Sequence, residues 1–105
     1  MLDKETVRQI VCDYSVEVQK YLNPEKIILF GSYVNGIPHE WSDIDVAVLV
    51  KNYSGDWIDT HSKLYGLKWE DRFTEIEPHL LDVTDDPSGF VEHVIKTGEV
   101  IYSSV

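Results

Sequence analysis

The spacing of apolar residues divides the first half of the chain into a helix and two strands. After Asp3, a favourable N-cap, apolar residues recur every three or four positions as far as Leu22, which predicts a helix that ends at Asn23-Pro24. Continuous apolar runs then predict a buried strand at 26–30 and a second strand at 43–50. Gly31 and Ser32 form a turn directly after the first strand and open a short helix.

The second half of the chain repeats this alternation of helix and strand. The expected elements are a helix capped by Asp56 and running to about Arg72, a strand at 73–81, a helix starting at Asp85-Asp86-Pro87 and ending at Gly98, and a strand at 100–102. Because Pro78 has no N–H to donate, the strand that contains it is expected to lie at a sheet edge or to form a bulge there. The whole order predicts one domain, residues 1–105, of α/β (α+β) class, with helices packed on a small mixed β-sheet.

The helix that starts at Asp56 carries an aromatic-rich stripe whose burial the sequence leaves open. Its members fall at helical spacing on one side: Trp57, Ile58, His61, Leu64, Tyr65 and Trp69. The stripe is interpreted as core, and the alternative is that part of it extends past the fold as a surface for a partner.

Composition narrows the classes of function. The chain has 105 residues and a formal net charge of −10, which repels polyanions and argues against a nucleic-acid substrate. A single nucleotide delivered as a metal complex remains compatible, because the metal reverses the local charge. Cys12 is the only cysteine, so no internal disulfide is expected. With neither a signal peptide nor an apolar run long enough to span a membrane, we expect a cytoplasmic protein without membrane association.

Two aspartates at the head of the second strand give the first indication of chemistry. Side chains two residues apart on a strand share a face, so Asp43 and Asp45 point together while Ile44 points the other way. Two neighbouring carboxylates repel each other, and a divalent cation between them relieves that repulsion. The sequence therefore predicts a metal site here.

The turn that precedes these acids suits phosphate. Gly31 permits backbone angles closed to other residues, Ser32 offers a hydroxyl, and free N–H groups at such a turn bind phosphate oxygens. Mg²⁺ is commonly held by one or two carboxylates together with substrate phosphates. A phosphate-binding turn beside two acids indicates nucleotide chemistry.

Taken together, a strand, Gly-Ser, a ten-residue spacer and Asp-x-Asp at the head of an apolar strand resemble a known signature. The segment GSYVNGIPHEWSDIDVAVLV is similar to the motif of the polymerase-beta-like nucleotidyltransferase superfamily, and the short chain resembles its minimal nucleotidyltransferase (MNT) branch. The resemblance implies the polymerase-beta-like palm fold and a third carboxylate on a neighbouring strand. Glu77 matches that place best and Glu75, on the same face, is the rival; His79 shares this face too.

The resemblance also implies a reaction and a partner. Asp43, Asp45 and Glu77 would hold one or two Mg²⁺ ions, while Gly31 and Ser32 would hold the phosphates of a nucleoside triphosphate. A nucleotidyl group, AMP from ATP by analogy, would pass to a hydroxyl acceptor. MNT proteins are commonly paired with a separate helical HEPN protein in toxin–antitoxin systems, and the MNT member can adenylylate its toxin.

Other functions stay open at this stage. Where many relatives carry a basic residue, this chain has Asn35 before Gly36, and no Lys or Arg lies between Gly31 and Val50. One alternative is therefore a binding module of the same fold, weak or inactive as an enzyme, that neutralises its partner by occlusion. Another is a nucleotidyltransferase for a small hydroxylated molecule such as an aminoglycoside. The oligomeric state, including a homo-oligomer, is left open.

Overall fold

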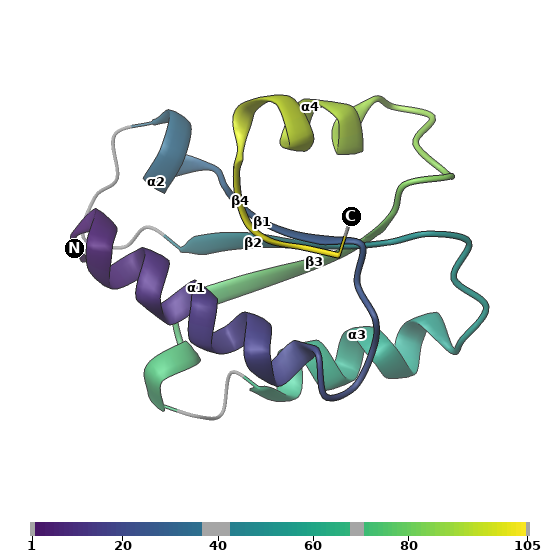
Figure 1. The fold of residues 1–105 in the computed structure, drawn as a ribbon, viewed down its shortest axis with the longest axis horizontal. Coiled ribbons are helices and arrows are strands. Elements are labelled where there is room, and N and C mark those ends of the chain that lie inside the picture. Colours follow the sequence, from purple (N-terminus) through teal and green to yellow (C-terminus); the bar gives the residue numbers. More distant parts are fainter. Residues whose placement is uncertain (1, 37–42, 68–70, 105) are drawn as a thin grey trace.

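The computed structural model of the protein describes residues 2–36, 43–67 and 71–104. Its elements in chain order are α1 (Lys4–Val18), β1 (Lys26–Phe30), α2 (Ser32–Asn35), β2 (Ile44–Val50), α3 (Trp57–Gly66), the 3₁₀ helix η2 (Asp71–Phe73), β3 (Ile76–Asp82), α4 (Phe90–Thr97) and β4 (Glu99–Ser103) (Figure 1). The part of the expected spacer that follows Gly36, residues 37–42, lies outside the described residues. Trp69 of the predicted helical stripe does so too.

A four-stranded mixed sheet lies at the centre of the fold. Its order is β3-β2-β1-β4; β1 runs antiparallel to both β2 and β4, whereas β2 and β3 are parallel. The predicted α+β class with a mixed sheet is confirmed. β3 is an edge strand, as Pro78 predicted, and the register sets Pro78 opposite Val46.

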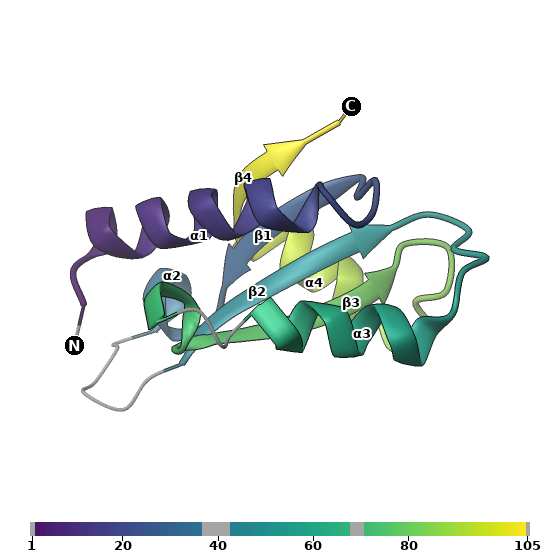
Figure 2. The same ribbon diagram turned by 90° about the horizontal axis from the view of Figure 1, so that it is seen from below.

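One face of the sheet is covered by α1 and α3, which lie side by side beneath it in Figure 1 and in front of it in Figure 2. The larger core lies here, and Tyr14 of α1 is fully buried in it. The Tyr14 hydroxyl donates a 2.9 Å hydrogen bond to the carbonyl oxygen of Leu64, and its ring meets the ring of Phe73 edge to face. These contacts fix the end of α3 against α1, close to the start of β3.

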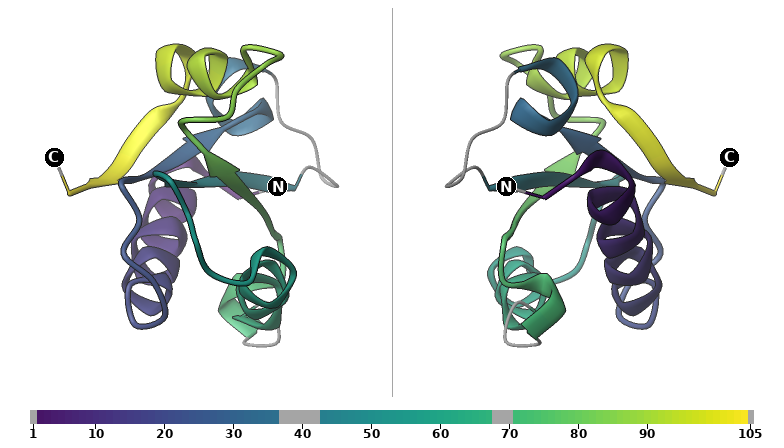
Figure 3. Two further views of the ribbon diagram at one scale, coloured as in Figure 1. Left: turned by 90° about the vertical axis from the view of Figure 1, so that its right-hand side faces the viewer. Right: turned by 90° about the vertical axis from the view of Figure 1, so that its left-hand side faces the viewer.

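The opposite face is covered by α4, and both views in Figure 3 show α4 on the other side of the sheet from α1 and α3. Val91 and Val94 pack there against apolar residues of the two central strands, Ile28, Ala47 and Leu49. Because side chains alternate along β2, Asp45 lies on this α4 face with Ala47, while Ile44 and Val46 enter the larger core. The Asp45 side chain therefore projects toward the face of the sheet that α4 covers, and away from the face covered by α1 and α3.

Four predicted boundaries were wrong by more than one residue. The first helix ends at Val18 rather than Leu22, and α3 ends at Gly66 rather than near Arg72. β3 starts at Ile76, since Phe73 belongs to η2. α4 starts at Phe90, after Gly89 with a φ of 77°, yet the Asp86 carboxylate still accepts hydrogen bonds from the N–H groups of Val91 and Glu92. The capping carboxylate was identified from the sequence, but its distance from the helix was not.

The helical stripe of α3 is only partly core. Leu64 is buried, but the side chains of Trp57 and Ile58 are 40% and 80% exposed, so the expectation of burial was wrong for these two. Thr60, one position from the stripe, is buried instead. None of the described helices combines the length and apolarity that crossing a membrane requires.

Candidate functional site

Asp45 and Gly31 form the centre of the candidate site. Gly31 has a φ of 83° and a ψ of −150°, a conformation that is essentially restricted to glycine. A Cβ atom at this position would overlap Oδ2 of Asp45. The turn after β1 thus lies directly against the half-buried Asp45 carboxylate, and Ser32, the first residue of α2, follows it.

Glu77 is the neighbour of Asp45 across the β2–β3 pair. The parallel register aligns Asp45 with Glu77, so their side chains share the α4 face of adjacent strands. Glu77 is half-buried, and one of its carboxylate oxygens accepts a hydrogen bond from the hydroxyl of Tyr65 on α3. Two acids that lie 32 positions apart in sequence are brought together by strand pairing.

Asp43 lies just before β2 and is exposed. Its charge reaches the same neighbourhood, because the pKa of the Tyr65 hydroxyl is raised by the hydrogen bond to Glu77, by burial, and then by the negative charges of Glu77 and Asp43. Tyr65 therefore lies in the field of two of the three predicted site acids.

Glu75 is placed differently from Glu77. It lies in the turn before β3, where its side chain is exposed and accepts a 3.0 Å hydrogen bond from the hydroxyl of Thr74. Its carbonyl oxygen accepts a 2.8 Å hydrogen bond from the N–H of Ile44, so the residue continues the backbone pairing to β2. Of the two rivals, Glu77 is the one that the strand register aligns with Asp45.

His79 is the other side chain in contact with Asp45. Its Nε2 lies 3.3 Å from Oδ1 of Asp45, and its ring meets the ring of Phe30 edge to face, with centroids 5.2 Å apart. Phe30 makes a similar contact with Phe90 of α4 at 5.8 Å. The three rings link β3, β1 and α4 by edge-to-face contacts on the side of the sheet where Asp45 lies.

Asp43, Asp45 and Glu77 have carboxylate oxygens that suit a hard cation, but their side chains do not converge on one point. Carboxylate oxygens are the ligands that Mg²⁺ prefers. Within residues 2–36, 43–67 and 71–104, however, no three His, Cys, Asp or Glu side chains are close enough together to hold a metal ion. One oxygen of Glu77 accepts from Tyr65 and one oxygen of Asp45 contacts His79, so a cation shared by the two acids would be held by their other carboxylate oxygens.

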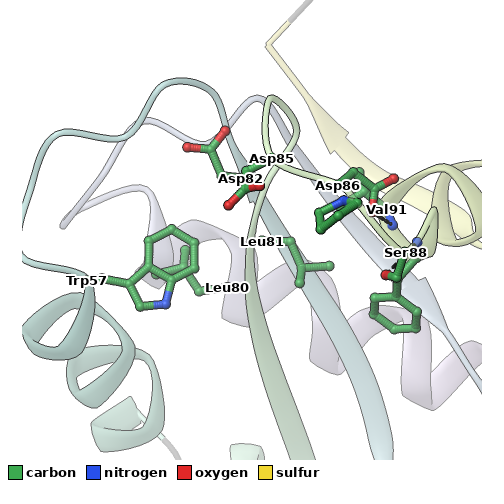
Figure 4. A pocket seen from close by; sticks show the side chains of 10 residues that line it. Trp57, Leu80, Leu81, Asp82, Asp85, Asp86, Ser88 and Val91 are labelled. Atoms are coloured by element: carbon green, nitrogen blue, oxygen red, sulfur yellow. Dashed lines mark hydrogen bonds between the residues drawn. The ribbon is translucent and has the colours of Figure 1, made fainter.

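A pocket of about 360 Å³ lies elsewhere, at the other end of β3 (Figure 4). Trp57 of α3 forms one side, and the segment before α4, with Asp86 and Ser88, forms the other. Leu81 and Asp82, at the end of β3, lie between them. Because Glu77 is near the start of the same strand, this pocket is separate from the candidate site.

Sequence reasoning missed Tyr65 as a member of the site. Its position in the stripe of α3 predicted core or a partner surface, yet its hydroxyl bonds to Glu77. No local pattern signals this contact, because it depends on how the last turn of α3 docks beside the edge strand. The contact of His79 with Asp45 could be anticipated only in part, from the face that His79 shares with Glu77.

Comparison with known proteins gives consistent matches. A model of the family described as Polymerase beta, Nucleotidyltransferase matches residues 15–105. An inferred protein adenylyltransferase of Methanocaldococcus jannaschii, MJ1305, is 32% identical over 65 residues, which is 60% of this chain and 44% of that protein. The match thus spans less than half the length of this curated relative.

Two solved structures have a similar fold. A toxin–antitoxin crystal structure with AMP-PNP aligns with a TM-score of 0.62 at 25% identity, covering 89% of this chain and 73% of that one. A complex of a tri-AMPylated Shewanella oneidensis HEPN toxin with its MNT antitoxin aligns with a TM-score of 0.57 at 22% identity, covering 92% and 73%.

Proposed function

Since the chain belongs to the polymerase beta nucleotidyltransferase family, we propose that it transfers a nucleotidyl group from a nucleoside triphosphate to a hydroxyl acceptor. The observation that carries this proposal is the alignment of Asp45 with Glu77 on adjacent strands, directly beside the Gly31 turn that touches Asp45. The arrangement brings carboxylates and a turn suited to phosphate into one place.

Asp43, Asp45 and Glu77 would hold one or two Mg²⁺ ions, whose chemistry is to neutralise the triphosphate and lower the barrier to displacement. Gly31 and Ser32 would bind the β- and γ-phosphates through backbone N–H groups and the Ser32 hydroxyl. The register of β2 with β3 supports Glu77 rather than Glu75 as the third carboxylate.

In the reaction, the acceptor oxygen attacks the α-phosphorus in line. The new O–P bond forms as the bond to the bridging oxygen breaks, and pyrophosphate leaves. We assign the hydroxyl proton to Glu77, because its carboxylate already accepts a hydrogen bond from a hydroxyl group, that of Tyr65. Most of the rate would come from the placement of the reactants and from stabilisation of developing charge.

For the donor and the acceptor we propose ATP and a separate HEPN-type toxin protein. The support is likeness: one aligned toxin–antitoxin structure contains AMP-PNP, and another complex contains an AMPylated HEPN toxin with its MNT antitoxin. The net charge of −10 disfavours a polynucleotide acceptor. The protein would then act in the cytoplasm as an MNT antitoxin.

A binding module that neutralises the same partner by occlusion is the second candidate. It is favoured by the present side-chain arrangement, in which the Glu77 carboxylate bonds to Tyr65 and Asp45 contacts His79 rather than a common centre. The absence of Lys and Arg between Gly31 and Val50 leaves triphosphate neutralisation to metal and backbone alone.

The test is incubation of the protein with radiolabelled ATP, Mg²⁺ and a candidate helical protein of the HEPN type. We expect label on that protein, reduced about 100- to 1,000-fold by Asp43→Asn. Asp59→Asn is the matched control, because Asp59 is an exposed aspartate of α3 that pairs with Lys63, and it should transfer label normally. Tight binding of the partner by both wild type and Asp43→Asn, without transfer by either, would establish the binding module instead.

A further inference from the structure

The Tyr65 hydroxyl lies within hydrogen-bond reach of the acid to which we assign proton removal. A general base must lie within hydrogen-bond reach of the proton it removes, and the hydroxyl of Tyr65 already donates to a carboxylate oxygen of Glu77. Glu77 in turn is aligned with Asp45. The described structure thus contains a hydroxyl of this chain's own next to the acid to which we assign proton removal.

The ring of Tyr65 is held in place on its own helix. Tyr65 lies in the last turn of α3, and the ring of His61, four residues earlier, meets it edge to face with centroids 5.0 Å apart. The same end of α3 is anchored to α1, because Tyr14 donates its hydrogen bond to the carbonyl of Leu64. A hydroxyl on a fixed ring loses little further freedom on reaching a near-attack position.

From this contact we propose that the protein nucleotidylates itself on Tyr65. The inference rests on the proposed function and adds an acceptor within the same chain. The Tyr65 oxygen forms a bond to the α-phosphorus of the nucleoside triphosphate, the bond from that phosphorus to the bridging oxygen breaks, and pyrophosphate carries away the bonding electron pair. The phenolic proton passes to Glu77.

The modification would limit the activity of the site. Once the Tyr65 oxygen is esterified it can no longer donate a hydrogen bond, and the attached nucleotide adds a negative phosphodiester beside Glu77 and Asp43. The product would occupy the place of an incoming acceptor. A protein acceptor and Tyr65 therefore compete for one position, and a bound partner reduces self-transfer.

The experiment measures the mass of the intact, full-length protein, both as purified from cells and after incubation with ATP and Mg²⁺. We expect a mass increase of one adenylyl group, which peptide mapping assigns to Tyr65. Tyr65→Phe abolishes the adduct, and Glu77→Gln slows its formation on the order of 100-fold or more. Tyr21→Phe is the matched control, because Tyr21 is an exposed tyrosine of the segment after α1, and it keeps the adduct.

Calorimetric binding of ATP with Mg²⁺ separates the two proposals when no adduct forms. Nucleotide binding and label transfer to the partner, without an adduct on the chain, would overturn self-modification and leave the proposed function standing. Failure to bind the nucleotide at all would overturn both. An adduct that persists in Tyr65→Phe, or maps to another residue, would also refute the assignment.

Discussion

The two ends of the β2–β3 pair use carboxylates in opposite ways. At the end where the strands finish, Asp82 accepts hydrogen bonds from the N–H groups of Asn52, Tyr53 and Thr84 and from the Thr84 hydroxyl. At the end where they begin, Asp45 contacts His79 and lies against Gly31. Asp82 joins the loops that follow β2 and β3, whereas Asp45 is the acid to which we assign a ligand.

The difference teaches that hydrogen bonding separates a structural acid from a candidate ligand. The bonds from Thr84 and then from Tyr53 lower the pKa of Asp82 to about 2, below its ordinary value of 3.8. A carboxylate satisfied in this way has little to gain from a cation. Asp45 and Glu77, at the other end, are aligned on neighbouring strands and partly exposed. Binding a cation would therefore stabilise these two carboxylates more than it would stabilise Asp82.

The strongest way to break this contrast is Gly31→Ala. The added Cβ would overlap the Asp45 carboxylate in a backbone conformation that disfavours side chains, so we expect about 3 kcal/mol of destabilisation and loss of nucleotidyl transfer. Urea denaturation measures the first effect and label transfer the second. Gly89→Ala is the control, since Gly89 has a similar φ of 77° but open space around it; we expect about 1 kcal/mol and unchanged transfer.

A smaller effect is expected from Asp82→Ala. Loss of the carboxylate removes the acceptor of the Tyr53 and Thr84 N–H groups, and because water can replace it in part we expect a cost of about 1 kcal/mol of unfolding free energy. Transfer of label should persist, because Asp82 is at the far end of the strand pair from Glu77. A large loss of transfer at full stability would show that the two ends are not independent.

The smallest expected effect is a change in unfolding free energy at low pH. Because the folded-state pKa of Asp82 lies below its ordinary value, its contribution to stability is complete above about pH 4 and is lost as the pH falls toward 2. Chemical denaturation of wild type and Asp82→Asn from pH 7 to pH 3 should show a difference in unfolding free energy that narrows below about pH 4. A difference that stays constant across this range would contradict the assignment.

The sequence predicted the parts of the fold that depend on local pattern. The apolar runs located β1 and β2, the Asp3 cap was confirmed by its hydrogen bond to the N–H of Thr6, and Pro78 predicted an edge strand. The alternation of β2 was also sufficient to place Asp45 on the face opposite Ile44.

Boundaries set by tertiary contacts could not be predicted in this way. Phe73 was predicted to begin a strand but is buried in a 3₁₀ turn, where its ring packs edge to face against Tyr14. Trp57 and Ile58 have helical spacing, yet they remain exposed because α3 buries Thr60 and Leu64 instead. Period-two alternation could not separate Glu75 from Glu77, whereas the start of β3 distinguishes them.

The parallel pairing of β2 with β3 also has a consequence for the order of folding. The β1–β2 ladder joins segments close in sequence, but Asp45 meets Glu77 only after the chain between them has closed a long crossover through α3, at a greater cost in loop entropy. We therefore expect β3 to dock late. In a chain still emerging from the ribosome, Asp43 and Asp45 would therefore be in place well before Glu77 joins them to form the proposed site.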